Sequence, residues 1–266
     1  MNSLNLNMRV NYHTHTYRCK HATGTEEEYI KVAISRGVEK LGFSDHAPID
    51  YGDFVSGCRM SCSQIDEYFD TLLNLKHKYR DYIDMFIGFE IEYSRLFDST
   101  VASYKKYPLD YLLLGQHYVG LECDMDVTNS FLNASASTLA KYVDECIKGI
   151  DTGIITYLAH PDCINYVGDD EVYDYEMSRL ISALNSKNIP LEINLLGIRR
   201  CRNYPSEKFF RLAKSTGAKV ILGCDAHAPL EVADSGEIEI AYRIADKYGL
   251  EVLEDCTLIN PFANKE

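Results

Sequence analysis

The chain has 266 residues, 46% of them hydrophobic, which is enough to form the core of one domain over residues 1–266. Its net charge of -13 argues against nucleic acid or a membrane as partner, although local Arg residues could still bind a small anionic substrate. The nine Cys include no CxxC pair, and the chain starts without an apolar segment of signal-peptide length, so we expect a reduced, cytoplasmic protein.

Seven short apolar runs rich in β-branched residues predict strands at 8–12, 40–43, 85–92, 111–115, 153–159, 189–195 and 218–223. Amphipathic segments lie between them. The first helix should begin after Thr25, which can form a capping box with Glu28, and the second should begin at Ser63. Further helices are expected at about 137–148, 174–186, 206–215 and 235–247.

The alternation of strands and helices predicts parallel strands with helical crossovers, in either an open sheet or a closed barrel. Almost every predicted strand ends at or beside a candidate ligand, and a closed barrel brings all such ends to one mouth. We therefore expect an α/β barrel. The polar, acidic segment 118–136 should form a loop over this mouth. The chain contains neither GxGxxG nor a P-loop motif, so no nucleotide cofactor is expected.

Most of the histidines lie in short clusters near the predicted strand ends. His13 and His15 are two residues apart after the first strand, so both imidazoles can face one metal ion. Asp45 precedes a histidine after the second strand, and Asp225 does so after the seventh. The candidate metal ligands are His13, His15, His21, His46, Glu90, His117, His160, Asp225 and His227.

Glu90 and Glu92 share one strand and should both face the barrel interior, where bound cations would offset the cost of burying them. We choose Glu90 as the metal-bridging ligand and keep Glu92 as the alternative. His77 lies in a charged helix end and is expected to be solvated. Nine ligands exceed the capacity of one ion, so we expect three divalent transition metal ions, which could be Zn, Mn or Fe. Water shared by two such ions could attack a phosphate ester.

Three arginines, Arg199, Arg200 and Arg202, follow the sixth predicted strand and should reach the same mouth. A guanidinium suits phosphate, so Arg199 or Arg200 is the expected phosphate ligand, with Arg18 as a further candidate. A solvated turn is the alternative for this cluster.

These motifs together resemble the polymerase and histidinol phosphatase (PHP) superfamily, and within it the monofunctional histidinol-phosphate phosphatases. The resemblance covers about residues 9–229 and rests on the initial HxH, with FSDHAP at 43–48, GFEIEY at 88–93, GQH at 115–117, AHPD at 159–162, LEIN at 191–194 and GCDAH at 223–227. It implies a distorted (β/α)7 barrel with a trinuclear site. The chain departs from the family's usual pattern at Cys224 and in the segment 195–197, and both positions are expected near the substrate.

The resemblance also implies how the ligands are shared among the three ions. The first would be held by His13, His15, Glu90 and Asp225, the second by Glu90, His117 and His160, and the third by His21, His46 and His227. We expect Asp225 and His227 to take part in catalysis, and Asp45 or Asp162 to give a proton to the leaving alcohol.

The leading hypothesis is a phosphomonoesterase that hydrolyses L-histidinol phosphate in histidine biosynthesis. A related alternative keeps the chemistry but uses another small phosphate ester. An amidohydrolase is a second enzyme class, although such barrels commonly use a metal-bridging Lys where this chain has His117. A non-catalytic metal-stabilised module is the third. The sequence carries no signal for an oligomeric state.

Overall fold

The computed structural model describes residues 8–125 and 128–263. Eight parallel strands form one curled sheet in the order β1-β2-β3-β4-β7-β8-β9-β10. Their bounds are β1 Val10–Asn11, β2 Lys40–His46, β3 Asp84–Ile91, β4 Tyr111–Leu114, β7 Tyr157–Leu158, β8 Leu191–Asn194, β9 Lys219–Gly223 and β10 Glu251–Val252. The first seven coincide with the seven predicted strands, so the expected α/β barrel is present, with a short eighth strand added.

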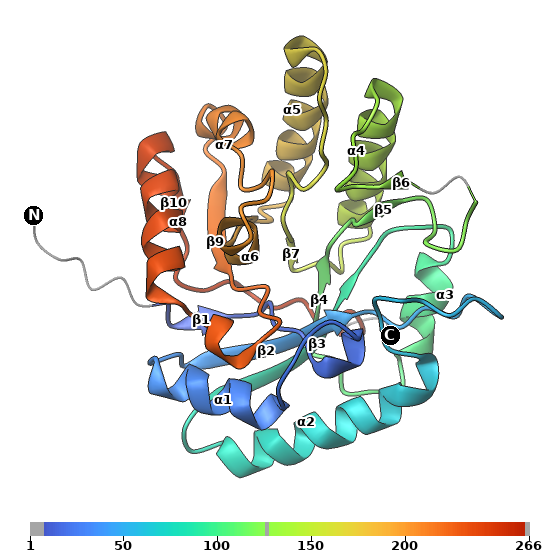
Figure 1. Cartoon of the computed structure of the whole chain (residues 1–266), viewed down its shortest axis with the longest axis vertical. Coiled ribbons are helices and arrows are strands. Elements are labelled where there is room, and N and C mark those ends of the chain that lie inside the picture. Colours follow the sequence, from blue (N-terminus) through green and yellow to red (C-terminus); the bar gives the residue numbers. More distant parts are fainter. Residues whose placement is uncertain (1–7, 126–127, 264–266) are drawn as a thin grey trace, which may run out of the picture.

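Helices surround this sheet, with α1 and α2 below it and α4, α5, α7 and α8 above it in the view of Figure 1. Their bounds are α1 Glu26–Ser35, α2 Ile65–Tyr79, α3 Phe97–Ser103, α4 Ala136–Asp151, α5 Asp170–Ser186, α6 Leu195–Arg199, α7 Glu207–Lys214 and α8 Ser235–Tyr248. Three short 3-10 helices also occur, at η1 Tyr17–Cys19, η2 Cys62–Gln64 and η3 Pro229–Glu231. In the described part of the chain, no helix combines the length and apolar character needed to cross a bilayer.

Local sequence explains several helix starts. The Thr25 side chain accepts from the Glu28 backbone N–H, and the Glu28 carboxylate accepts from the Thr25 backbone N–H, which confirms the predicted capping box of α1. Helix α5 begins four residues before its predicted start, because Asp169 caps its first turn.

The predicted loop 118–136 contains a small antiparallel pair, β5 Tyr118–Val119 and β6 Thr128–Asn129. Residues 126–127 of that expected loop lie outside the described residues. The pair and the residues that follow it form one side of the barrel mouth, as the prediction required, but with paired strands in place of an irregular loop.

The barrel closes along a seam between β1 and β9. At the mouth, Thr14 forms a parallel bridge with Ala226, and the His15 backbone N–H donates to the Ala226 carbonyl at 3.0 Å. At the opposite end, β10 pairs with β9, and Asp255 just beyond β10 accepts from the Tyr12 hydroxyl at 2.7 Å. The C-terminal segment therefore fills the lower part of the seam, while residues beside the candidate ligands close its upper part.

Candidate metal centre

All nine candidate ligands meet at the mouth of the barrel. They follow or end the strands β1, β2, β3, β4, β7 and β9, whose C-terminal ends converge there. Several sets of three offer nitrogen or oxygen atoms within 4.8 Å of one another, including His13 with His15 and Glu90, His46 with Glu90 and His117, and His21 with His46 and His227. The structure therefore brings all nine predicted ligands together, and their binding of metal ions stays a prediction.

Glu90 lies at the centre of the cluster and is 1% exposed. Its Oε1 lies 2.8 Å from His160 Nε2, and its Oε2 lies 2.9 Å from His46 Nδ1. Burial raises the pKa of Glu90, but the surrounding imidazoles outweigh this and hold it well below its usual range. A Cβ at position 115 would lie 2.0 Å from Glu90 Oε1, so only glycine leaves room for this carboxylate. The site is shaped around an ionised Glu90.

Three imidazoles in the cluster are held in their neutral form. Burial, followed by the neighbouring His15, lowers the pKa of His21, and it lowers the pKa of His46 and His227 well below the usual range. A neutral ring nitrogen is the form that binds a metal ion. These three histidines form one of the candidate ligand sets, so their protonation state suits that use.

Several polar atoms in the cluster are poorly satisfied by the described residues. His227 Nε2 makes no hydrogen bond, Glu90 Oε2 makes none although His46 Nδ1 lies 2.9 Å away, and the His13 and His15 Nε2 atoms face each other at 3.2 Å. Unpaired buried polar atoms are costly, and cations placed among these nitrogens and oxygens would satisfy them. The donor set of imidazole and carboxylate therefore fits divalent transition metal ions.

The backbone is strained at two of the candidate ligands. His160 has φ +29° and Asp225 has φ +45°, a region that residues with a Cβ rarely adopt. Such conformations cost about 1–3 kcal/mol each and cluster at functional sites. In this structure Asp225 Oδ1 is brought to 3.0 Å from His15 Nε2.

Glu192 supports two candidate ligands and was missed in the sequence analysis. Its Oε1 lies 2.8 Å from His13 Nδ1, and its Oε2 accepts from the His160 backbone N–H at 2.8 Å. A Cβ at position 223 would lie 1.7 Å from Glu192 Oε1, so Gly223 makes room for it. A carboxylate behind a metal-binding imidazole fixes its ring orientation. The signal was present, because Glu192 interrupts an apolar strand as Glu90 does.

Glu92, the alternative to Glu90, also lies behind a candidate ligand. Its Oε1 is 3.1 Å from His117 Nδ1, and its Oε2 accepts from the buried Arg59 at 3.2 Å. Burial raises the pKa of Glu92, but Arg59 and His117 together lower it below its usual value. The contacts thus distinguish the two carboxylates, with Glu90 inside the cluster and Glu92 beside it.

The two proposed proton donors do not line the pocket. Asp45 contacts the Thr16 hydroxyl and accepts from the His46 backbone N–H at 2.8 Å. Asp162 accepts from the Ser206 backbone N–H at 2.5 Å, and burial raises its pKa to about 6. Both carboxylates organise backbone near the ligands, so the structure corrects their expected role as acids that reach a substrate. Asp225 and His227, by contrast, do line the pocket.

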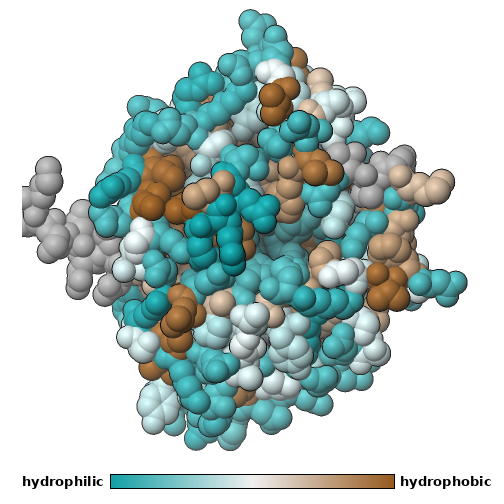
Figure 2. Space-filling view, in the orientation of Figure 1, coloured by the Kyte–Doolittle hydropathy of each residue, from teal (hydrophilic) through white to brown (hydrophobic). Residues whose placement is uncertain are grey.

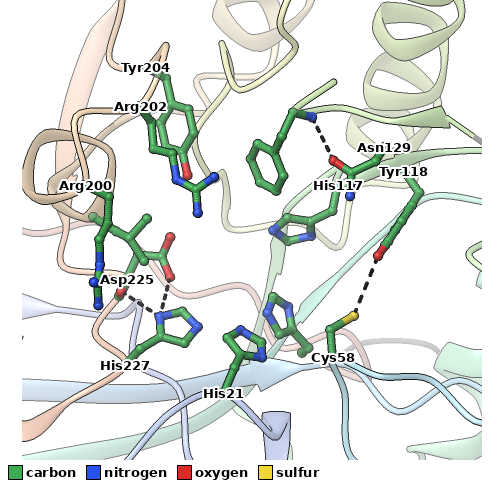
Figure 3. Close-up of a pocket in the computed structure, with 13 residues that line it drawn as sticks. His21, Cys58, His117, Tyr118, Asn129, Arg200, Arg202, Tyr204, Asp225 and His227 are labelled. Atoms are coloured by element: carbon green, nitrogen blue, oxygen red, sulfur yellow. Dashed lines mark hydrogen bonds and ion pairs between the residues drawn. The ribbon is translucent and has the colours of Figure 1, made fainter. Parts of the chain in front are cut away.

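The pocket above the cluster has a volume of about 390 Å³. Figure 2 shows the hollow near the centre of this face, with strongly hydrophilic side chains on its border. In Figure 3, Arg200, Arg202 and Tyr204 lie on one side of it, and His117, Tyr118, Asn129 and Cys58 lie on the other, with His21 and His227 below. Phe131 and Leu196 complete the apolar part of the wall.

Two of the expected phosphate ligands are engaged elsewhere. Arg18 is buried in ion pairs with Glu26 and Glu67, and Arg199 binds both carboxylate oxygens of Glu237, at 2.6 and 2.7 Å. Neither lines the pocket, which corrects their predicted role.

Arg200 and Arg202 do line the pocket. The side chain of Arg200 is 57% exposed, with one contact to Glu231 at 3.3 Å, and the guanidinium of Arg202 lies 5.2 Å from the Phe131 ring centroid. The sequence analysis placed Arg202 in the cluster but did not select it.

A family model for the PHP domain matches residues 11–195, well over half of the chain. The chain belongs to the PHP domain family. A "Probable histidinol-phosphatase" from Deinococcus radiodurans is 25% identical over 83% of this chain and 86% of its own length. The "Histidinol-phosphatase" of Bacillus subtilis is 23% identical over 87% and 96%. Membership of the PHP family favours the phosphatase hypothesis over the amidohydrolase alternative.

Among solved structures, the chain is similar to the histidinol phosphate phosphatase of Lactococcus lactis, complexed with Zn, L-histidinol and phosphate. The TM-score is 0.71 at 19% identity, and the match covers 92% of this chain and 95% of the other. This similarity confirms the PHP-type α/β barrel.

Proposed function

We propose that this PHP protein is a metal-dependent phosphomonoesterase that hydrolyses L-histidinol phosphate to L-histidinol and phosphate. The observation that carries the proposal is the placement of nine His, Glu and Asp ligands, most of them buried, beneath a pocket that also presents Arg200 and Arg202. The relatives named histidinol-phosphatase, and the similar barrel complexed with L-histidinol and phosphate, support this choice of substrate.

The ligand groups support three ions. His13, His15, Glu90 and Asp225 would hold one, Glu90, His117 and His160 a second, and His21, His46 and His227 a third. When bound, such ions supply Lewis-acid activation of water and neutralise negative charge on phosphate oxygens. Their number is testable by elemental analysis of the reconstituted protein, where at most one ion per chain would exclude the polynuclear site.

The chain's own residues bind and orient the ester. Arg200 and Arg202 present guanidinium groups that suit the oxygens of a phosphate. Glu192 and Glu92 hold the His13 and His117 rings in place, so that the nitrogens opposite point into the cluster. The alcohol portion of the substrate would then contact the wall formed by Tyr118, Asn129 and Phe131.

A second candidate is a phosphatase of another small phosphate ester. A "Probable phosphatase" from Clostridium acetobutylicum is as similar to this chain, at 25% identity over 86% of it and 83% of the other. A panel of phosphorylated amino alcohols, sugars and nucleotides would separate the two. We expect the highest kcat/KM for L-histidinol phosphate, and a clear preference for another ester would replace it as the substrate.

Arg202→Ala should lower kcat/KM, because a charge-assisted contact to phosphate would be lost in a partly enclosed pocket. The decrease should correspond to a loss of about 2 to 4 kcal/mol of transition-state stabilisation. Arg200→Ala should act in the same direction but less strongly, because its side chain is largely exposed. Metal content should not change in either variant. Lys at position 202 should restore only part of the loss, because an ammonium lacks the planar fork.

Steady-state kinetics with L-histidinol phosphate provide the measurement. Arg211→Ala is the control, since Arg211 is an exposed residue of α7 that pairs with Asp174. Wild-type kcat/KM in both pocket variants would show that phosphate is recognised without these arginines.

A further inference from the structure

We infer that Arg59 is a positioning residue that acts in two directions, fixing the His117 ring through Glu92 and the pocket wall through Glu122. This inference rests on the proposed metal-dependent phosphatase function. Arg59 lies in the irregular segment between β2 and α2, yet it is only 2% exposed. When a loop residue buries its guanidinium away from water, the N–H groups need hydrogen-bond acceptors within the protein. The acceptors of Arg59 therefore show what it does.

Arg59 contacts three separate parts of the mouth. Its Nη1 donates to the Ala47 carbonyl at 3.2 Å, directly after His46. Its Nη2 donates to Glu92 Oε2 at 3.2 Å, and its Nε donates to Glu122 Oε2 at 2.9 Å. One planar group thus joins the ends of β2 and β3 to the segment between β5 and β6, an arrangement that the guanidinium fork allows and an ammonium does not.

The first direction leads to a candidate metal ligand. Glu92 uses its other oxygen, Oε1, to contact His117 Nδ1 at 3.1 Å, while His117 Nε2 points to Glu90 Oε1 at 3.5 Å. Arg59 therefore holds the Glu92 carboxylate in place, and Glu92 sets the tautomer and orientation of His117. Glu192 holds His13 through an equivalent carboxylate contact.

The second direction leads to the side of the pocket opposite the arginines. Glu122 accepts from the Ser56 hydroxyl at 2.8 Å and contacts the Cys58 thiol at 3.6 Å. Cys58 in turn contacts the Tyr118 hydroxyl at 4.0 Å, as Figure 3 shows. Because Cys58 and Tyr118 both line the pocket, Arg59 and Glu122 set the shape of the wall that faces the leaving group.

The test separates the two directions in the zinc-loaded protein. We measure the rate at which excess chelator removes zinc, together with kcat and KM for L-histidinol phosphate. Arg59→Lys and Glu92→Gln should both release zinc faster, by about 10- to 100-fold, as expected when the support of a metal-binding imidazole is lost. Glu122→Gln should keep the wild-type release rate and raise KM several-fold.

Arg18→Lys is the matched control, because Arg18 is equally buried and paired with carboxylates, but those carboxylates contact none of the candidate ligands. It should lower thermal stability and leave zinc release unchanged. Equal acceleration in Arg18→Lys would mean that zinc release merely follows overall stability, which overturns the inference.

Wild-type zinc release in both Arg59→Lys and Glu92→Gln would also overturn the inference. Glu92→Gln keeps the test decisive if Arg59→Lys does not fold, because it preserves side-chain size. Failure of the proposed function would look different, since the wild-type protein itself would then bind no zinc or hydrolyse no phosphate ester.

Discussion

Glu90→Ala should reduce turnover by orders of magnitude and lower the metal content of the protein. Glu90 is the carboxylate around which the imidazoles from four strand ends gather, and under the proposed function it serves two ions. Removing Glu90 would displace both ions. The ions would then no longer activate water or neutralise the charge on the phosphate oxygens. Kinetics with L-histidinol phosphate, and elemental analysis of the same sample, provide the measurement. His13→Ala and Asp225→Ala should give losses of similar size.

His77→Ala is the control for this series, because His77 is exposed near the end of α2 and contacts Arg80 rather than the cluster. It should retain wild-type kinetics and metal content. Circular dichroism of each variant checks that the fold persists. If Glu90→Ala kept wild-type turnover, or if His77→Ala were as damaging, the assignment of ligands would be wrong.

Removing the metal ions should lower the midpoint of thermal unfolding substantially. A ligand that binds only the folded state at about 1,000 times its dissociation constant adds about 4 kcal/mol of stability. At about 2–4 °C per kcal/mol for a chain of roughly this size, one such ion corresponds to a shift of roughly 8–16 °C. Calorimetry before and after chelation, and again after zinc is restored, measures this effect.

Glu90→Ala supplies the matched comparison for this second prediction. Its unfolding midpoint should respond much less to chelation and to added zinc, because the bridging ligand is absent. An unchanged midpoint for the wild-type protein after verified metal removal would show that the ions do not contribute to folding stability.

Much of the fold could be predicted because its strands are continuous apolar runs with helical segments between them. The exceptions are short. Helices α3 and α6 have only seven and five residues, and β10 has two, so none spans enough sequence to show a period. Helix α6 also starts directly after β8, with no polar break between them beyond its own capping residue, Asn194.

The candidate ligands were predictable for a different reason, since residues at the ends of parallel strands must meet at one mouth. Ion-pair partners are not fixed in this way. The guanidinium groups of Arg18 and Arg199 are chemically suited to bind phosphate. Only the structure shows that they form ion pairs with Glu26 and Glu237 instead. Arg59 went unnoticed because its partners come from three different connections around the mouth.

The seam between β1 and β9 has a consequence for how the protein folds. His13 and His15 lie near one end of the chain and Asp225 and His227 near the other, and the upper seam is closed beside them by the pairing of Thr14 with Ala226. An ion bound by both groups is a reversible crosslink across almost the whole chain, and it offsets the entropy lost in closing that long loop. A nascent chain that has not yet added β9 lacks Asp225 and His227, so under the proposed ligand sets this crosslink can form only once the barrel has closed.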